Sequence, residues 1–263
     1  MASGQAVEGE TLDLLLRDRV ALLQARQGYR TSVDSLLLAA FAAALPGPAP
    51  SRFVDLGAGT GLVAILLALR LEQTQALLVE RQASMADRAR RNLRLNGLMG
   101  RASVLERDIA EPWADPPQAP LVLSNPPYFR AAGRMLPKDL ERAEAHYEST
   151  ASVERFAEVA ASMLAPGGTV VFVYPFEGHT RVLHGLAEAG LGERELHPFV
   201  HRDLAEPPHR VLVVARHGAS SLQRLPPQPI QLRDPPDGLY SPALQAFVEA
   251  LPIGAAERAR ELA

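Results

Sequence analysis

The sequence predicts an α/β fold in which a mainly parallel β-sheet carries helices on both faces. Three observations predict it: 263 residues are enough to bury a sizeable core, 47% of them are apolar and 22% charged, and short apolar runs alternate with helical patterns. A strand, a helix and a second strand at this spacing form a βαβ unit, whose two strands run parallel. We expect residues 1–263 to form a single domain.

Six apolar runs predict the strands of this sheet, and they are residues 53–56, 76–80, 102–106, 121–123, 169–174 and 210–215. Apolar residues at helical spacing predict the helices 32–45, 62–71, 84–96, 152–164 and 180–189. Ser32 is a suitable N-cap for the first of these helices. Residues 1–45 should form an N-terminal strand and helix cap, and residues 220–251 a proline-rich arm and a C-terminal helix.

Composition excludes several classes of protein. No uninterrupted apolar run reaches the roughly 18 to 20 residues that a membrane helix needs, and no basic segment followed by an apolar one opens the chain. The absence of cysteine excludes disulfides and thiolate metal sites, and the histidines lack the H-E-x-x-H spacing of a metal site. We therefore expect a cytoplasmic protein with no membrane partner and no metal.

The charge balance also limits the partners. A net charge of -3, from 27 basic and 30 acidic residues, argues against a protein that coats nucleic acid by bulk charge. It leaves room for an enzyme that contacts RNA through a local basic patch. The oligomeric state stays open.

The most distinctive motif is the glycine-rich segment 55–61, DLGAGTG, directly after the apolar run 53–56. Glycines let a backbone turn tightly and approach a ligand, and α/β folds bind ligands at the carboxyl edge of the sheet. The dinucleotide-binding fingerprint needs a small residue where Leu62 stands. The pattern is instead acid-x-G-x-G-x-G.

A second motif, Ser124-Asn125-Pro126-Pro127-Tyr128, follows the run 121–123. Its residues suit an amine conjugated to a ring, which is a poor nucleophile because its lone pair is delocalised. The Asn125 side-chain oxygen and the Pro126 carbonyl can accept both amine hydrogens and favour a pyramidal nitrogen. The two prolines stiffen the loop, and the Tyr128 ring offers a face on which a base can stack, a role that does not need the hydroxyl.

Together these motifs resemble those of class I S-adenosylmethionine-dependent methyltransferases that act on planar amino groups, whose second motif is (D/N/S)-P-P-(Y/F/W). The resemblance implies a Rossmann-like seven-stranded sheet with helices on both faces, and S-adenosylmethionine as the cofactor. The implied catalytic residues are Asn125, Pro126, Pro127 and Tyr128. The implied cofactor-binding residues of the two motifs are Asp55, Gly57, Gly59, Gly61 and Asn125.

Further acidic positions fit the same resemblance. Glu80 ends the run 76–80, where Rossmann-like families place an acid that binds the ribose hydroxyls of the cofactor, because a carboxylate can accept from two adjacent O–H groups. Asp108 and Ile109 follow the run 102–106 and resemble the pair that brackets the cofactor adenine.

A narrower resemblance rests on residues 28–39, GYRTSVDSLLLA. They are similar to the G-Y-R-x-x-x-D-x-x-L-L-A segment of bacterial tRNA(Val) adenine-N6-methyltransferases, which modify the adenine next to the anticodon. In that family the segment packs over the cofactor, which implies cofactor contacts from Arg30 and Asp34. The alternative is an ordinary helix start, with Asp34 in the first turn. Residues 208–212 (PHRVL) and 232–240 resemble the same family.

The expected reaction is methyl transfer from S-adenosylmethionine to an adenine N6 in tRNA. Two alternatives stay open: N5-methylation of a glutamine on a protein such as a release factor, and a non-catalytic RNA-binding factor with the same fold. The polar stretch 130–150 is long enough to form a lid over the substrate. The phosphate contacts expected there are Arg130, Arg134, Lys138 and Arg142.

Overall fold

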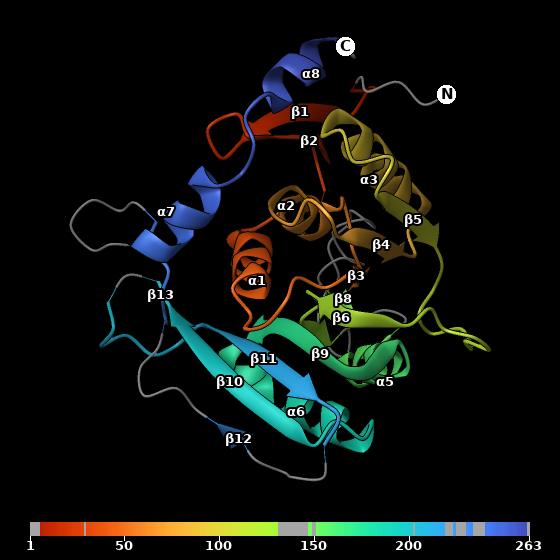
Figure 1. Ribbon diagram of the computed structural model, residues 1–263, viewed down its shortest axis with the longest axis vertical. Coiled ribbons are helices and arrows are strands. Elements are labelled where there is room, and N and C mark those ends of the chain that lie inside the picture. Colours follow the sequence, from red (N-terminus) through yellow and green to blue (C-terminus); the bar gives the residue numbers. More distant parts are fainter. Residues whose placement is uncertain are drawn as a thin grey trace.

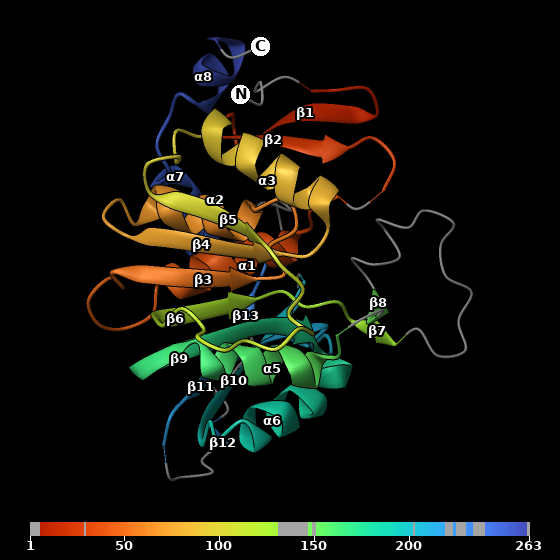
Figure 2. The ribbon, with the colours of Figure 1, turned by 90° about the vertical axis from the view of Figure 1, so that its right-hand side faces the viewer.

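The structure is a computed structural model of the chain (Figure 1). It describes residues 6–28, 30–130, 147–148, 151–201, 203–218, 223–224, 230–233 and 240–261. A twisted sheet runs through the middle of the molecule, and Figure 2 shows its strands stacked one above the other from β5 to β12.

Within the described residues the central sheet has nine strands, seven of them longer than two residues. The long strands follow the order β5-β4-β3-β6-β9-β11-β10, and β11 runs antiparallel to both of its neighbours. Their bounds are β3 Arg52–Leu56, β4 Gln75–Glu80, β5 Ala102–Glu106, β6 Ala119–Ser124, β9 Leu164–Pro175, β10 Glu193–Val200 and β11 Arg210–Arg216. Because β4 and β6 flank β3 in parallel, the carboxyl ends of these three strands meet at one edge.

The predicted Rossmann-like, seven-stranded sheet is confirmed, with one difference. Two short strands, β12 (Gln223–Arg224) and β13 (Ile230–Gln231), pair with β10 in parallel. The sequence patterns also missed β10 itself, because its residues ERELHPFV mix charged and apolar side chains and include Pro198.

Helices cover both faces of the sheet, as predicted. On one face lie α1 (Val33–Ala43), α2 (Leu62–Arg70), α3 (Ala83–Leu95) and α7 (Pro242–Glu249), and on the other lie α5 (Val153–Ser162) and α6 (His179–Glu188) (Figure 1). Each set buries its apolar side against the sheet and forms its own apolar cluster, which is the main source of stability. The predicted N-cap is confirmed, since the Ser32 side chain accepts from the Asp34 N–H.

An N-terminal hairpin of β1 (Glu10–Leu15) and β2 (Val20–Ala25) lies against α3, with α8 (Ala255–Glu261) beside it (Figure 2). Two buried asparagines one helical turn apart make the contact. The Asn96 carboxamide accepts from the Ala21 N–H at 3.1 Å and donates to its carbonyl at 2.7 Å. The Asn92 carboxamide does the same for Leu23, and it also donates to the Thr60 carbonyl at 2.9 Å. The hairpin is thereby tied to the glycine-rich loop.

Buried charges strengthen the same interface. The Glu10 carboxylate accepts from Arg91 at 2.6 Å and from Arg88 at 2.9 Å, and all three side chains are 4% to 11% exposed. Burial alone would raise the pKa of Glu10, but the two guanidinium groups outweigh it and hold the pKa at about 2. Both carboxylate oxygens are satisfied, which is the condition for a buried ion pair to be tolerated.

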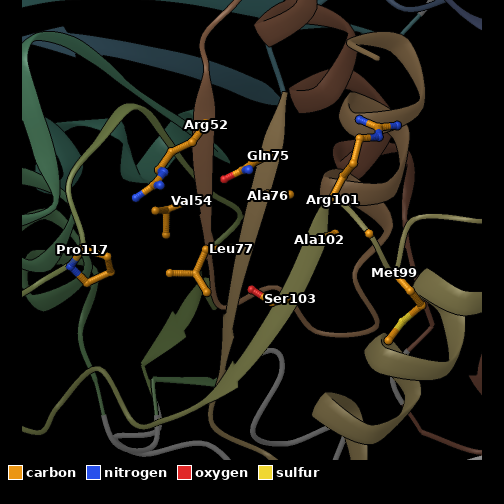
Figure 3. Close-up of a pocket in the computed structure, with 11 residues that line it drawn as sticks. Arg52, Val54, Gln75, Ala76, Leu77, Met99, Arg101, Ala102, Ser103 and Pro117 are labelled. Carbon is orange, nitrogen blue, oxygen red and sulfur yellow. The ribbon is translucent and has the colours of Figure 1, made fainter. Parts of the chain in front are cut away.

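One pocket lies at the amino ends of three neighbouring strands (Figure 3). Arg52, Gln75 and Ala102, the first residues of β3, β4 and β5, line it, together with Met99 and Pro117. It is therefore at the opposite edge of the sheet from the two motifs. None of the helices within the described ranges is both long and apolar enough to cross a membrane.

Candidate active site

The glycine-rich loop leaves β3 at its carboxyl end and leads into α2. Gly57, Gly59 and Gly61 have positive φ angles of 70°, 56° and 87°, the region that glycine adopts without steric cost. The N–H groups of Gly57 and Ala58 donate to the Val79 carbonyl at 2.9 and 3.0 Å. The loop is therefore folded back over the end of β4.

The loop packs so closely against the rest of the protein that two of its glycines leave no room for a side chain. A Cβ atom at Gly57 would lie 3.0 Å from the Phe156 ring, and one at Gly61 would lie 3.0 Å from Leu78. Both distances are shorter than ordinary contacts. The loop is thus packed against the protein at Gly57 and Gly61, while residues 57–59 stay partly exposed.

Asp55, the acid that opens the motif, is 1% exposed. Burial raises its pKa to about 7, against the hydrogen bond from the Ala64 N–H, and the nearby Glu80 adds to the rise. Its Oδ2 has no hydrogen-bond partner among the described residues. A buried polar atom without a partner is costly, which makes Asp55 a candidate for a ligand contact.

Glu80 links the loops that follow β3 and β4. Its Oε2 accepts from the Gly59 N–H and its Oε1 from the Gln82 N–H, both at 2.8 Å. The side chain is 6% exposed, and burial raises the pKa of its carboxyl group. Its predicted binding to ribose hydroxyls stays a prediction, and the structure adds a second role in holding the glycine-rich loop.

The loop after β5 comes to the same edge of the sheet. Asp108 Oδ1 accepts from the Ala110 N–H at 2.8 Å, and its Oδ2 lies 3.8 Å from Arg81 Nε. Ile109 is buried, and its carbonyl accepts from Arg155 Nε at 2.8 Å. The side chain of Ile109 can therefore offer an apolar surface, whereas its backbone is held from α5.

The second motif begins at the end of β6, beside β3. The buried Ser124 hydroxyl donates to the Leu56 carbonyl at 2.8 Å, so it joins the start of this motif to the strand that carries the glycine-rich loop. Pro126 is buried, whereas Asn125, Pro127 and Tyr128 are half-buried. The structure thus brings the two sequence motifs together at one edge.

Tyr128 is held by two residues far away in the sequence. Its hydroxyl lies 3.0 Å from Asp34 Oδ2 and also contacts Asn125 Oδ1. Arg210 Nε donates to the same Asp34 oxygen at 3.0 Å, and the guanidinium group lies 5.3 Å from the centre of the Tyr128 ring. Asp34, for which a cofactor contact is predicted, is therefore bonded to the second motif.

Two site residues were not among the predicted ones. Arg210 belongs to the PHRVL segment, whose resemblance could have pointed to it. Tyr174, near the end of β9, packs its ring edge-on against Tyr128 with centroids 5.5 Å apart, and its hydroxyl lies 3.4 Å from the Tyr128 carbonyl. Tyr174 is 1% exposed. In the sequence it is recognisable only as one residue of an apolar run that predicts a strand.

Other predicted residues lie elsewhere. The Arg30 guanidinium contacts the hairpin, through the Asp13 carboxylate and at 3.0 Å from both Thr11 Oγ1 and the Ala25 carbonyl. Its cofactor contact stays a prediction. Of the four expected phosphate contacts, Arg134, Lys138 and Arg142 lie outside the described residues, and Arg130 belongs to the short strand β7 (Phe129–Arg130), which pairs with β8 (Tyr147–Glu148).

Comparison with known proteins identifies the family to which this chain belongs. Residues 33–185, which include both motifs and Glu80, match the family model described as methyltransferase small domain. This chain belongs to the methyltransferase small domain family. Membership confirms the enzyme class and the S-adenosylmethionine cofactor expected from the sequence.

Curated relatives of this methyltransferase cover most of both chains. A tRNA1(Val) (adenine(37)-N6)-methyltransferase from Cronobacter sakazakii is 31% identical over 239 residues, which are 86% of this chain and 89% of the relative. One from Porphyromonas gingivalis is 26% identical over 90% of this chain and 94% of its own. The expected resemblance is thereby confirmed over nearly the whole chain.

Solved structures support the fold of this methyltransferase. A predicted O-methyltransferase from Agrobacterium tumefaciens superposes with a TM-score of 0.64 at 23% identity, over 84% of this chain and 98% of that one. The 16S rRNA N2 G1207 methyltransferase of T. thermophilus, solved with AdoMet and guanosine, gives a TM-score of 0.53 at 18% identity, over 80% and 50%. At these identities the likeness concerns the fold alone.

The residues at the edge fit S-adenosylmethionine. The glycine-rich loop offers backbone groups with no Cβ in the way, and Asp55 has a buried oxygen without a protein partner among the described residues. Glu80 and Asp108 supply carboxylates at the ends of the next two strands, and Ile109 supplies an apolar side chain. Among the described residues, no group of three or more histidine or acidic side chains is placed to hold a metal ion.

Proposed function

We propose that this methyltransferase transfers a methyl group from S-adenosylmethionine to the exocyclic N6 amine of an adenine in tRNA, next to the anticodon of tRNA(Val). The observation that carries the proposal is the junction of Ser124 with Leu56, which sets Asn125 beside the glycine-rich loop. The names and coverage of the curated relatives support the substrate.

The cofactor is held by residues from the ends of four strands. Asp55, Gly57, Gly59 and Gly61 follow β3, and Glu80 ends β4. Asp108 and Ile109 follow β5, and Asn125 follows β6. When bound, S-adenosylmethionine supplies a methyl group already activated by its sulfonium. The work left for this chain is alignment of the target amine, which is worth up to roughly 7 to 11 kcal/mol in enzymes.

The second motif performs that alignment. The Asn125 carboxamide oxygen and the Pro126 carbonyl accept the two hydrogens of the adenine amine, which favours a pyramidal nitrogen with its lone pair free. Pro127 adds stiffness, since the φ angles of two successive prolines are fixed. No strong base is required: as the amine nitrogen bonds to the methyl carbon, the bond from that carbon to sulfur would break, with its electron pair left on a neutral thioether. The nitrogen becomes acidic in this step, and one proton leaves to water.

The RNA is bound by local rather than overall charge. Arg130, Arg134, Lys138 and Arg142 contact phosphates, so the dependence of binding on salt is shallow, with each neutralised phosphate adding about 0.7 to 0.9 to the slope. Reversing the charge at two of these positions weakens tRNA binding and leaves the cofactor affinity unchanged.

Tritium transfer tests the proposal directly. The protein is incubated with labelled S-adenosylmethionine and either bulk tRNA or a protein extract, and nucleosides from the tRNA are then analysed by mass spectrometry. The expected product is N6-methyladenosine in tRNA(Val), absent from cells that lack this protein. Label in protein instead would support glutamine methylation, and cofactor binding without any transfer would support a non-catalytic factor.

A further inference from the structure

The Tyr128 hydroxyl lies between two oxygen atoms. One is Oδ2 of Asp34 at 3.0 Å, and the other is Oδ1 of Asn125. A tyrosine hydroxyl carries a single hydrogen, so it cannot donate a full hydrogen bond to both. The hydroxyl hydrogen must therefore point either to Asp34 or to Asn125.

Asp34 is the stronger acceptor. It is buried at 3% exposure, and the same oxygen accepts from Arg210 Nε at 3.0 Å in a charge-assisted hydrogen bond. A carboxylate accepts more strongly than a carboxamide. With the hydrogen on the Asp34 side, the phenol oxygen can accept, both from the Arg210 guanidinium group and from Asn125. The two ends of a carboxamide exchange by a 180° rotation, so the NH2 group of Asn125 can donate to it.

We propose that Asp34 is a positioning residue, which holds the Tyr128 hydroxyl hydrogen so that Tyr128 accepts from the Asn125 NH2 and turns the Asn125 oxygen toward the target amine. This inference rests on the proposed function. It gives the Tyr128 hydroxyl a role beside the stacking of the ring. We call Arg210, Asp34, Tyr128 and Asn125 the relay.

The surroundings keep the relay in place. Arg210 lies 5.3 Å from one side of the Tyr128 ring, and the buried Tyr174 meets the ring edge-on at 5.5 Å. Tyr174 is itself in hydrogen-bond distance of Arg181 at 3.4 Å, and Arg181 forms a bidentate pair with Glu154 at 3.0 and 2.9 Å. The ring is therefore fixed from two directions, which fixes the position of its hydroxyl.

Single-turnover methylation of tRNA tests the proposal. Tyr128→Phe keeps the ring and removes the hydroxyl, so the turnover should fall roughly 10-fold to 100-fold, the range for one hydrogen bond to a charged group. The tRNA KM and the S-adenosylmethionine Kd should change less than threefold. Asp34→Asn keeps the shape of the side chain but makes it a weaker acceptor, so its turnover should lie between those of wild type and Tyr128→Phe. The matched control is Tyr240→Phe, which removes the hydroxyl of a half-buried tyrosine outside the relay.

The combined variant separates positioning from general damage. If Asp34 acts through the Tyr128 hydroxyl, Asp34→Asn adds no further loss of turnover in the Tyr128→Phe background. Multiplied losses in the double variant would overturn the proposal. So would an unchanged turnover in Tyr128→Phe.

A second measurement needs no substrate. The side-chain NH2 signals of Asn125 in a ¹⁵N-labelled protein are identified by their loss in Asn125→Ala. Tyr128→Phe should shift them and speed their exchange with water, and Tyr240→Phe should not. A shift in a protein that methylates no tRNA would contradict the proposed function and keep the relay. Methylation of tRNA by a protein whose Asn125 signals do not shift in Tyr128→Phe would contradict the relay and leave the proposed function in place.

Discussion

Asp34 and Arg210 are 176 residues apart in the sequence, and Arg210 Nε donates to Asp34 Oδ2 at 3.0 Å. The contact joins the first turn of α1 to the first residue of β11, and both side chains reach Tyr128. Three segments that resemble one enzyme family at separate places in the sequence therefore meet at a single point.

This pair should contribute to stability. Arg210→Met should lower the free energy of unfolding by about 1 to 3 kcal/mol, because the buried Asp34 side chain loses its hydrogen-bonded ion-pair partner. Combining it with Asp34→Leu should cost less than the sum of the two single changes. Urea unfolding of the wild type and the three variants gives the coupling energy. Strictly additive losses would show that the contact has no energetic weight.

The Asn125 side chain should matter for chemistry and little for binding. Asn125→Ala removes the acceptor next to the amine as positive charge develops on nitrogen, so turnover should fall roughly 100- to 1000-fold, or ~2.7 to 4 kcal/mol. The cofactor Kd, measured by calorimetry, should stay near that of wild type. Single-turnover assays with saturating tRNA separate the two. A near-normal rate would exclude the proposed role of Asn125.

Glu80 should affect both the cofactor and the fold. Glu80→Ala should weaken S-adenosylmethionine binding by roughly 1.5 to 3 kcal/mol. It also leaves the N–H groups of Gly59 and Gln82 without their acceptor, so the free energy of unfolding should fall by about 1 to 3 kcal/mol. Glu80→Gln should recover part of the stability, since one amide oxygen remains. Calorimetry and urea unfolding measure the two effects, and an unchanged cofactor affinity in both variants would remove Glu80 from the site.

The loop should not tolerate a side chain at Gly57. Gly57→Ala has two costs: a positive φ angle of 70°, worth about 1 to 2 kcal/mol for a residue with a Cβ, and a contact of 3.0 Å with the Phe156 ring. Phe156→Leu in the same protein should relieve the contact and leave the backbone cost. Thermal unfolding of the single and double variants checks this. A stable Gly57→Ala protein with normal cofactor affinity would contradict the close packing.

Acid should release the hairpin from α3. The folded pKa of Glu10, about 2, lies below its ordinary value of 4.5, so the unfolded chain binds the proton more readily. The stabilisation is therefore complete above pH 4.5 and is lost as the pH falls toward 2. Glu10→Gln should be less stable than wild type by roughly 3 kcal/mol at pH 7 and nearly equal to it at pH 2. A difference that does not change between these pH values would contradict the assignment.

Local patterns in the sequence were enough for six of the seven long strands, the helices on both faces and the two motifs at the carboxyl edge of the sheet. Strands such as β3 and β4 are short apolar runs bounded by turns, and the glycine spacing of the loop is itself a local property. Glu80 was predictable for the same reason, because its place at the end of a strand depends on neighbours in the sequence. β10 was missed because Pro198 and the charged residues of ERELHPFV interrupt the apolar pattern of a strand. Its strand conformation depends on pairing with β11, which the local sequence does not show.

The fold class follows from the spacing of short apolar runs and helical patterns. The enzyme family and the positions of Asn125 and Glu80 follow from motifs that resemble those of known methyltransferases and that each span only a few turns of chain. The roles of the buried polar side chains, in contrast, depend on contacts between segments far apart in the sequence. Asn92 and Asn96 look like ordinary helix residues until β2 lies beside them. Asp34 could have faced solvent, the cofactor or the protein, and the choice depended on Arg210 and Tyr128 reaching it from distant strands. The direction of a buried polar group is set by the partner that satisfies it, and that partner is brought there only by folding.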